Sequence, residues 1–307
     1  MEEEDAQLWS DGNHLWLRSR EDGGYLHADN DGAGVSLHGG RKSLNTAWAV
    51  HVYRNDYAAY LLLHSAAYGG YLAATRTRAP RGHRGFRVVQ RNYDEQELEA
   101  IKWSIVDGPG NSFLLRNVES GRHRYLRANG KFRPWNNAVS VDDNSSTMMH
   151  WIVECIPPIR RIPGLAAPVR EGRLGDLSVA LGLRAAPSWL EIRFVRASND
   201  GLYDEEGNQG WKSCPLESRS VDLLRNKLAS RLNVDAFNLI MCVRAGRYGR
   251  LTPLVDNLPS YGDRSTIEIV VITRYTPAAK RLTHPDVDAS DPAFLVDDGC
   301  ISCSPYK

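Results

Sequence analysis

Apolar and polar residues alternate in three short stretches in the first half of the chain, and a Tyr-Leu-x-Ala motif follows each stretch. The stretches are Leu15–Ser19, Leu61–Ser65 and Phe113–Asn117. The motifs begin at Tyr25, Tyr71 and Tyr125. Alternation with a period of two is the pattern of a β-strand with one buried face. In the first motif it places Leu26 and Ala28 on one face of a strand and Tyr25 on the other.

Each motif belongs to a repeating unit of about 50 residues, and three such units fill residues 10–155. Every unit has four short strand patterns and closes on a Trp. Three units that cannot each bury a face alone predict a β-trefoil, in which the strands form a closed barrel and a cap around a pseudo-threefold axis. The alternative is an open β-sandwich. In the trefoil, the equivalent barrel residues are Leu26, Leu72 and Leu126, and the equivalent core anchors are Trp48, Trp103 and Trp151.

The closing Trp residues could instead form platforms for sugars. Ricin-type lectin trefoils carry Gln-x-Trp at the end of each unit. The triplets here are Thr46–Trp48, Ile101–Trp103 and Met149–Trp151, and all three lack the Gln. The sequence therefore favours buried core anchors and leaves a carbohydrate-binding, lectin-like trefoil as the alternative.

The trefoil repeats are followed by a segment rich in Pro, Gly and Arg, whose composition is typical of a linker. A different pattern begins after it. One helix is expected after Ser220, a suitable N-cap, and Asn233 suits the position just past its end. Its apolar stripe is Val221, Leu224, Leu228 and Leu232. Strands are expected at Leu190–Val195, Leu239–Val243 and Thr266–Thr273, with a hairpin candidate that leads to Trp211. The order strand, strand, helix, strand, strand predicts a small α+β domain of the ubiquitin-like β-grasp type.

Two segments of the first half, LWLRSREDGGYLHAD at residues 15–29 and YLLLHSAAYGGYLAA at residues 60–74, resemble the plant domain-of-unknown-function 569 family. The segment VRAGRYGRLTPLVDNLPS at residues 243–260 resembles the second domain of the same family. The resemblance implies a fascin-like, actin-crosslinking-type trefoil followed by that second domain. Members commonly continue past the second motif with an apolar Pro-Phe segment, whereas this chain has TRTRAPRGHRGF at residues 75–86.

These patterns divide the chain into four parts. We expect a trefoil at residues 8–156, a linker at 157–187, a β-grasp domain at 188–276 and a disordered tail at 277–307. Because the linker carries several prolines and little apolar periodicity, the trefoil is expected to fold without the remainder. Whether the two domains dock is left open by the sequence.

The composition narrows the classes of function. With 38 Lys and Arg against 37 Asp and Glu, the net charge is +1, so the chain is no polycation built for nucleic acid. No apolar stretch approaches the roughly 20 residues of a membrane span, and the acidic start is not a secretory signal. Five scattered cysteines fit reduced thiols in the cytosol or nucleus. The pair Cys300 and Cys303 lacks the further ligands that zinc needs, so no metal or cofactor is expected.

No catalytic motif is recognisable, and we expect the chain not to be an enzyme. The hydrolase elbow, the phosphate-binding loop, the zinc-protease helix and the dinucleotide fingerprint are all absent from the sequence. The pattern instead predicts a non-catalytic interaction protein. Its trefoil binds a protein partner, and the resemblance makes actin filaments the candidate.

One cluster of charge stands out in the second unit. Between Thr75 and Tyr93 the chain has no acidic residue. It does have six arginines there, Arg76, Arg78, Arg81, Arg84, Arg87 and Arg91. The first four are expected in a loop between strands. The ordinary interpretation is a solvated loop; the sharper one is a docking surface for an acidic partner, which the guanidinium fork suits.

Overall fold

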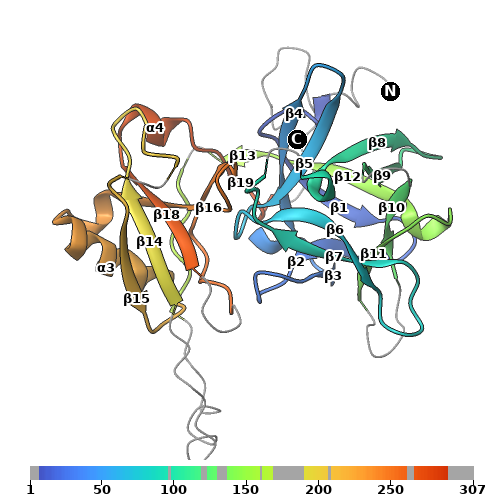
Figure 1. Ribbon diagram of the computed structural model, residues 1–307, viewed down its shortest axis with the longest axis horizontal. Helices are drawn as coiled ribbons and strands as arrows, with labels where there is room; N and C mark the ends of the chain where they lie inside the picture. The colour runs from blue at the N-terminus through green and yellow to red at the C-terminus, as the bar shows by residue number, and fades with distance from the viewer. Residues whose placement is uncertain are drawn as a thin grey trace, which may run out of the picture.

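The computed structural model describes residues 7–95, 98–118, 123–129, 137–159, 161–168, 190–206, 209–260 and 266–289. Figure 1 shows two lobes that lie side by side, a barrel of short strands and a smaller lobe built on a second sheet. Within the described ranges, no helix has the length and apolar character to cross a membrane.

The barrel contains three units of four strands. The first unit has β1 (His14–Ser19), β2 (Tyr25–Ala28), β3 (Val35–His38) and β4 (Ala47–Arg54). The second has β5 (Ala59–Ser65), β6 (Tyr71–Arg78), β7 (Phe86–Arg91) and β8 (Trp103–Asp107). The third has β9 (Phe113–Asn117), β10 (Arg124–Ala128), β11 (Val139–Asp142) and β12 (Trp151–Ile156). Each closing strand follows a single 3₁₀ turn, η1 (Leu44–Thr46), η2 (Glu99–Ile101) or η3 (Thr147–Met149).

The twelve strands form one sheet, and pairing of β1 with β12 joins its first and last strands. The alternation of the first motif is present as predicted, with Leu26 and Ala28 buried and Tyr25 half-buried. These observations confirm the predicted trefoil.

The three closing Trp residues hold equivalent places in the core. Their side chains and those of the three motif leucines are 0% exposed. Each indole N–H donates to the backbone carbonyl of the motif leucine in its own unit: Trp48 to Leu26 at 3.0 Å, Trp103 to Leu72 at 2.9 Å and Trp151 to Leu126 at 3.0 Å. The prediction of equivalent buried anchors is confirmed, and the hydrogen bonds explain why Trp recurs rather than Phe.

The smaller lobe is a β-grasp domain. Its sheet contains β14 (Leu190–Arg196), β15 (Lys212–Leu216), β16 (Leu239–Arg244), β17 (Leu251–Pro253) and β18 (Thr266–Thr273), in the order β15-β14-β18-β16-β17. Strands β14 and β18 are parallel and the other pairs are antiparallel. Strand β17 was not predicted because three residues are too few to show a period.

Helix α3 (Val221–Leu232) packs its buried residues Val221, Leu224 and Leu228 against one face of this sheet. The Ser220 hydroxyl accepts from the Leu223 amide at 3.3 Å, and Asn233 ends the helix with φ 53°. Both caps were predicted. A 3₁₀ turn, η4 (Ala236–Asn238), leads from the helix into β16.

The prediction of a disordered tail is wrong for residues 277–289. Helix α4 (Pro277–Lys280) follows β18, and β19 (His284–Pro285) then pairs with β13 (Pro158–Ile159), directly after the barrel. Val287 and Ala289 pack against a group of buried barrel residues that includes Trp16. The tail lacked a period because its few apolar residues fit a surface that the barrel supplies. The remaining predicted tail, 290–307 with the two cysteines, lies outside the described residues, as does most of the predicted linker, at residues 169–187.

Candidate functional site

The arginine cluster lies on the β6–β7 hairpin. Arg76 and Arg78 lie on β6, so their predicted loop position is wrong. Strand β6 continues because Thr75 suits an extended backbone and its hydroxyl donates to the Arg87 carbonyl at 2.8 Å. Beyond an irregularity in the register, Arg78 pairs with Phe86. Arg81 and Arg84 do lie in the connection, and Arg87 and Arg91 lie on β7.

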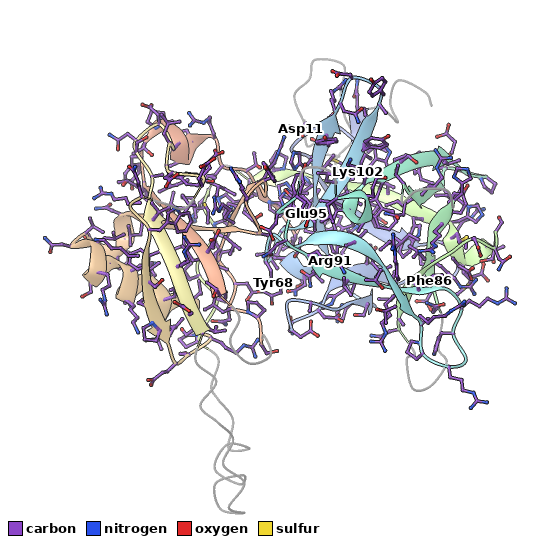
Figure 2. All side chains as sticks on the ribbon, in the orientation of Figure 1. Asp11, Tyr68, Phe86, Arg91, Glu95 and Lys102 are labelled. Atoms are coloured by element: carbon purple, nitrogen blue, oxygen red, sulfur yellow. The ribbon has the colours of Figure 1, made fainter. Side chains whose placement is uncertain are left out.

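All six side chains are exposed, but the structure does not bring them together on one surface. Phe86 and Arg91 lie at opposite ends of β7, and Figure 2 shows Arg91 nearer than Phe86 to the β-grasp domain, with which it lines a common cleft. Strand alternation turns Arg87 to the face opposite Phe86. The cluster of six therefore divides into Arg76, Arg78, Arg81 and Arg84 around the hairpin end, Arg87 behind them, and Arg91 at the domain boundary.

Two arginines of the third unit complete the hairpin end. The Arg124 guanidinium carbon lies 4.0 Å from the Phe86 ring centroid, and that of Arg78 lies 5.1 Å from it. Arg127 lies near Arg84: burial lowers the pKa of Arg127, and the charge of Arg84 lowers it further while Asp142 opposes the change. We call Phe86, the arginines of the hairpin end and the two arginines of β10 together the basic hairpin surface; the arginines are Arg76, Arg78, Arg81, Arg84, Arg124 and Arg127.

Sequence reasoning missed Arg124, Arg127 and the role of Phe86. The signal lay in the trefoil itself, because β7 pairs with β11 of the next unit, with Phe86 opposite Val141. That pairing brings the second-unit hairpin next to β10, where Arg127 lies within the third Tyr-Leu-x-Ala motif and Arg124 directly precedes it.

Arg91 lines a separate cleft of about 610 Å³ between the two domains. On the β-grasp side the cleft is lined by Arg193, Arg244 and Glu268. Glu268 accepts from both arginines, with N–O distances of 2.7 Å to Arg193 and 2.6 Å to Arg244. The opposing charges satisfy one another, so this cleft has the character of a domain junction rather than of a site selective for one charge.

The domains dock through the loop at residues 245–252. The Tyr93 amide donates to the Ala245 carbonyl and the Tyr248 amide to the Tyr93 carbonyl, both at 2.8 Å. The Tyr71 hydroxyl accepts from the Arg250 amide at 3.0 Å. Tyr71 is completely buried between this loop and barrel side chains such as Tyr93, whereas its repeat equivalents Tyr25 and Tyr125 are half-buried. The docking loop belongs to the segment that carries the family resemblance.

Gly246 is the position at which docking depends on the absence of a side chain. Its φ is +91°, and an added Cβ would lie 2.6 Å from the Tyr93 backbone nitrogen. Gly246→Ala should cost roughly 1–3 kcal/mol of stability for each of two causes, backbone strain and the clash. It should also speed hydrogen exchange of the Tyr93 amide.

Gly82→Ala is the matched control, because Gly82 has φ +93° with nothing within 4 Å of an added Cβ. It should show the strain alone and leave exchange at Tyr93 unchanged. Equal stability loss in both variants, with no change at Tyr93, would contradict the inferred role of Gly246 in docking.

Buried thiols and the side-chain types that bind metals are the remaining groups relevant to chemistry. Burial raises the pKa of the Cys155 thiol to about 11 and that of Cys242 to about 12, which keeps both thiols protonated. The described parts of the chain contain no group of three or more His, Cys, Asp or Glu side chains arranged to hold a metal. The buried closing Trp residues have no free ring face for a sugar.

The fold places this chain in the class of proteins in which a β-trefoil is docked on a β-grasp domain. A family model described as the beta-trefoil domain of unknown function DUF569 matches residues 6–154. A second, described as the DUF569-associated ubiquitin-like domain, matches residues 189–272. The chain belongs to the DUF569 family, as its sequence motifs predicted.

Several solved structures are similar to part of this chain. A Caenorhabditis elegans protein of unknown function is 18% identical, covering 47% of this chain and 93% of that chain, with a TM-score of 0.40. The SDF2-like protein from Arabidopsis thaliana is 15% identical, covering 47% and 92%, with a TM-score of 0.40. A Macrolepiota procera ricin B-like lectin in complex with lactose is 19% identical, covering 47% and 96%, with a TM-score of 0.38. No curated protein matches the chain.

Proposed function

We propose that this chain is a non-catalytic interaction protein that binds an acidic protein partner through the basic hairpin surface. The observation that carries the proposal is that Arg78 and Arg124, from two different units, both lie against the Phe86 ring. The same hairpin end carries three further exposed arginines, Arg76, Arg81 and Arg84. The fascin-like resemblance supplies actin filaments as the candidate partner. The β-grasp domain fixes the opposite edge of the barrel and leaves the hairpin end uncovered in the described structure.

Arginine suits this role on physical grounds. The guanidinium group binds carboxylates through two parallel hydrogen bonds, and a stacked ring holds it in place. Clustered positive charge also attracts an acidic partner before contact and raises the association rate. Salt screens this attraction beyond about 8 Å under physiological conditions. Crosslinking of filaments needs two sites per particle. We therefore expect one copy to bind a filament and only an oligomer to bundle filaments.

Replacing Arg76, Arg78, Arg81 and Arg84 with serine should weaken filament binding at least tenfold and flatten its salt dependence. The fold should be retained, because exposed charges contribute little to stability. The measurement is co-sedimentation with actin filaments at two salt concentrations.

The matched control removes four positive charges elsewhere, by serine substitution at Lys42, Arg54, Arg196 and Arg231, all of which are exposed. It lowers the net charge equally and should bind like the wild type at both salt concentrations. If all three proteins bound filaments with equal affinity and equal salt dependence, the hairpin would be an ordinary solvated surface and the proposal would be contradicted. Binding on a glycan array without filament binding would favour the lectin alternative.

A further inference from the structure

The β-grasp domain has a cavity of about 480 Å³ that the proposed function does not use. It lies beside the first residues of β16, where β17 no longer covers the strand: β17 pairs with Cys242–Arg244 only. The segment at residues 161–168 forms another part of the wall and is fixed to the domain, since the Ala166 amide donates to the Val255 carbonyl at 2.8 Å. Helix α4 closes a further side, and these elements can be followed in Figure 1.

The lining of this cavity has two kinds of side chain. Its apolar part includes Ile162, Leu165, Met241 and Leu254. Its charged residues are Arg161, Arg225, Arg274 and Lys280, and no carboxylate lies among the lining residues. In the cleft between the domains, by contrast, a carboxylate that lines the cleft neutralises two arginines. Here Arg225 is paired with Asp222, which does not line the cavity.

Two of the guanidinium groups are incompletely bonded. The Nε atoms of Arg225 and Arg274 are enclosed and have no hydrogen-bond partner. Arg225 donates through Nη2 to Asp222 at 2.6 Å, so part of its hydrogen-bonding capacity is satisfied. Buried charged donors without acceptors are costly, and an anion that enters the cavity supplies the missing acceptors.

We propose that this cavity binds a small amphipathic anion, with an apolar body and one carboxylate or phosphate group. The volume is that of a small-molecule site. The apolar wall removes the body of the ligand from water, and Arg274, Arg225, Arg161 and Lys280 hold its anionic group. The shared chemistry fits an aliphatic acid or an aryl phosphate, and the test distinguishes the two.

The test compares paired probes by isothermal titration calorimetry on the full chain. Decanoate is paired with decanol, and 1-naphthyl phosphate with 1-naphthol. In at least one pair, the anion should bind saturably with a stoichiometry of one and about tenfold or more tighter than its neutral partner. The pair that shows this identifies the source of the anion. Equal binding of anion and neutral partner in both pairs, or no saturable binding of either anion, would overturn the proposal.

Three variants locate the site. Arg274→Gln should weaken anion binding about tenfold. Lys280→Gln, at an exposed position, should weaken it by a smaller factor and keeps the test valid if Arg274→Gln fails to fold. Arg196→Gln, an exposed arginine of the same domain outside the cavity, should bind like the wild type. If Arg196→Gln weakened anion binding as much as the cavity variants do, the anion would be attracted non-specifically by positive charge, and the proposal would also be overturned.

Discussion

Replacing Trp103 with alanine should lower the free energy of unfolding by roughly 3–5 kcal/mol. The indole is 0% exposed, so its removal leaves a large cavity in the centre of the barrel. The Leu72 carbonyl also loses its donor at 2.9 Å. Urea denaturation measures the change, and the equivalent substitutions at Trp48 and Trp151 should cost a similar amount because the three units share one core.

Two further variants test how much of this loss comes from the cavity and how much from the lost hydrogen bond. Trp103→Phe keeps most of the apolar volume and should cost less than the alanine change, with a remaining loss of about 1–3 kcal/mol from the unpaired Leu72 carbonyl. Tyr57→Ala removes an aromatic ring that is 94% exposed and should change stability by no more than about 0.5 kcal/mol. A Trp103→Ala loss as small as that of Tyr57→Ala would contradict the shared-core interpretation.

Acidification from pH 6.5 towards pH 4 should destabilise the folded chain through a group of histidines at and near the contact between the two domains, which we call the domain seam. His14 lies opposite Ala49, which lies opposite His64, and His64 lies opposite Tyr71, so these residues follow one line across four strands. The His64 ring nitrogen Nδ1 lies 3.2 Å from the Thr252 hydroxyl of the β-grasp domain.

Burial controls the charge of these side chains. It lowers the pKa of His14 to about 4, and the charge of His284 acts in the same direction. Burial also lowers the pKa of His51 and of His284 to about 4, and that of His64 well below its ordinary value. The nearby charge of Arg250 lowers the pKa of both His51 and His64, whereas Asp11 raises that of His51.

The direction in which stability changes with pH follows from proton binding by the folded and unfolded chains. Between the ordinary histidine pKa of about 6.5 and the folded values near 4, the unfolded chain binds protons that the folded chain does not. The stabilisation is therefore fully present above pH 6.5 and is lost as the pH falls towards 4. Each histidine contributes up to about 1.4 kcal/mol per pH unit to the slope of unfolding free energy against pH.

The measurement is that slope between pH 5 and 6.5, by urea denaturation of three proteins. His64→Gln should reduce the slope by close to one proton. His38→Gln, which removes an exposed histidine, should leave the slope as in the wild type. Identical slopes for the wild type and His64→Gln would contradict the seam as the source of the pH dependence.

The docked seam also bears on whether the trefoil folds alone, which stays a prediction. The isolated barrel would expose Tyr71, Tyr93 and His64, all buried in the full chain. It would also lose the β19 strand and the cover over Trp16. We expect a fragment ending near Pro158 to fold cooperatively, because its central core is internal to the barrel, but with lower stability than the barrel has in the full chain.

The sequence by itself determined the repeated core and the helix caps. Leu26, Leu72 and Leu126 recur because equivalent barrel positions demand the same side chain, and such repetition is visible without coordinates. Ser220 and Asn233 act on neighbouring backbone, so local chemistry was sufficient to predict them.

Only the tertiary structure decided what covers the outside of the barrel. Tyr25, Tyr71 and Tyr125 occupy the same place in the repeat, yet of the three only Tyr71 is completely buried and contacts the 245–252 loop. A period-2 pattern reports which residues face the barrel interior, and it says nothing about which outer positions a second domain will contact. The same reason separated Arg91 from the other arginines and added Arg124, because contacts between units and between domains depend on surfaces that exist only after the chain has folded.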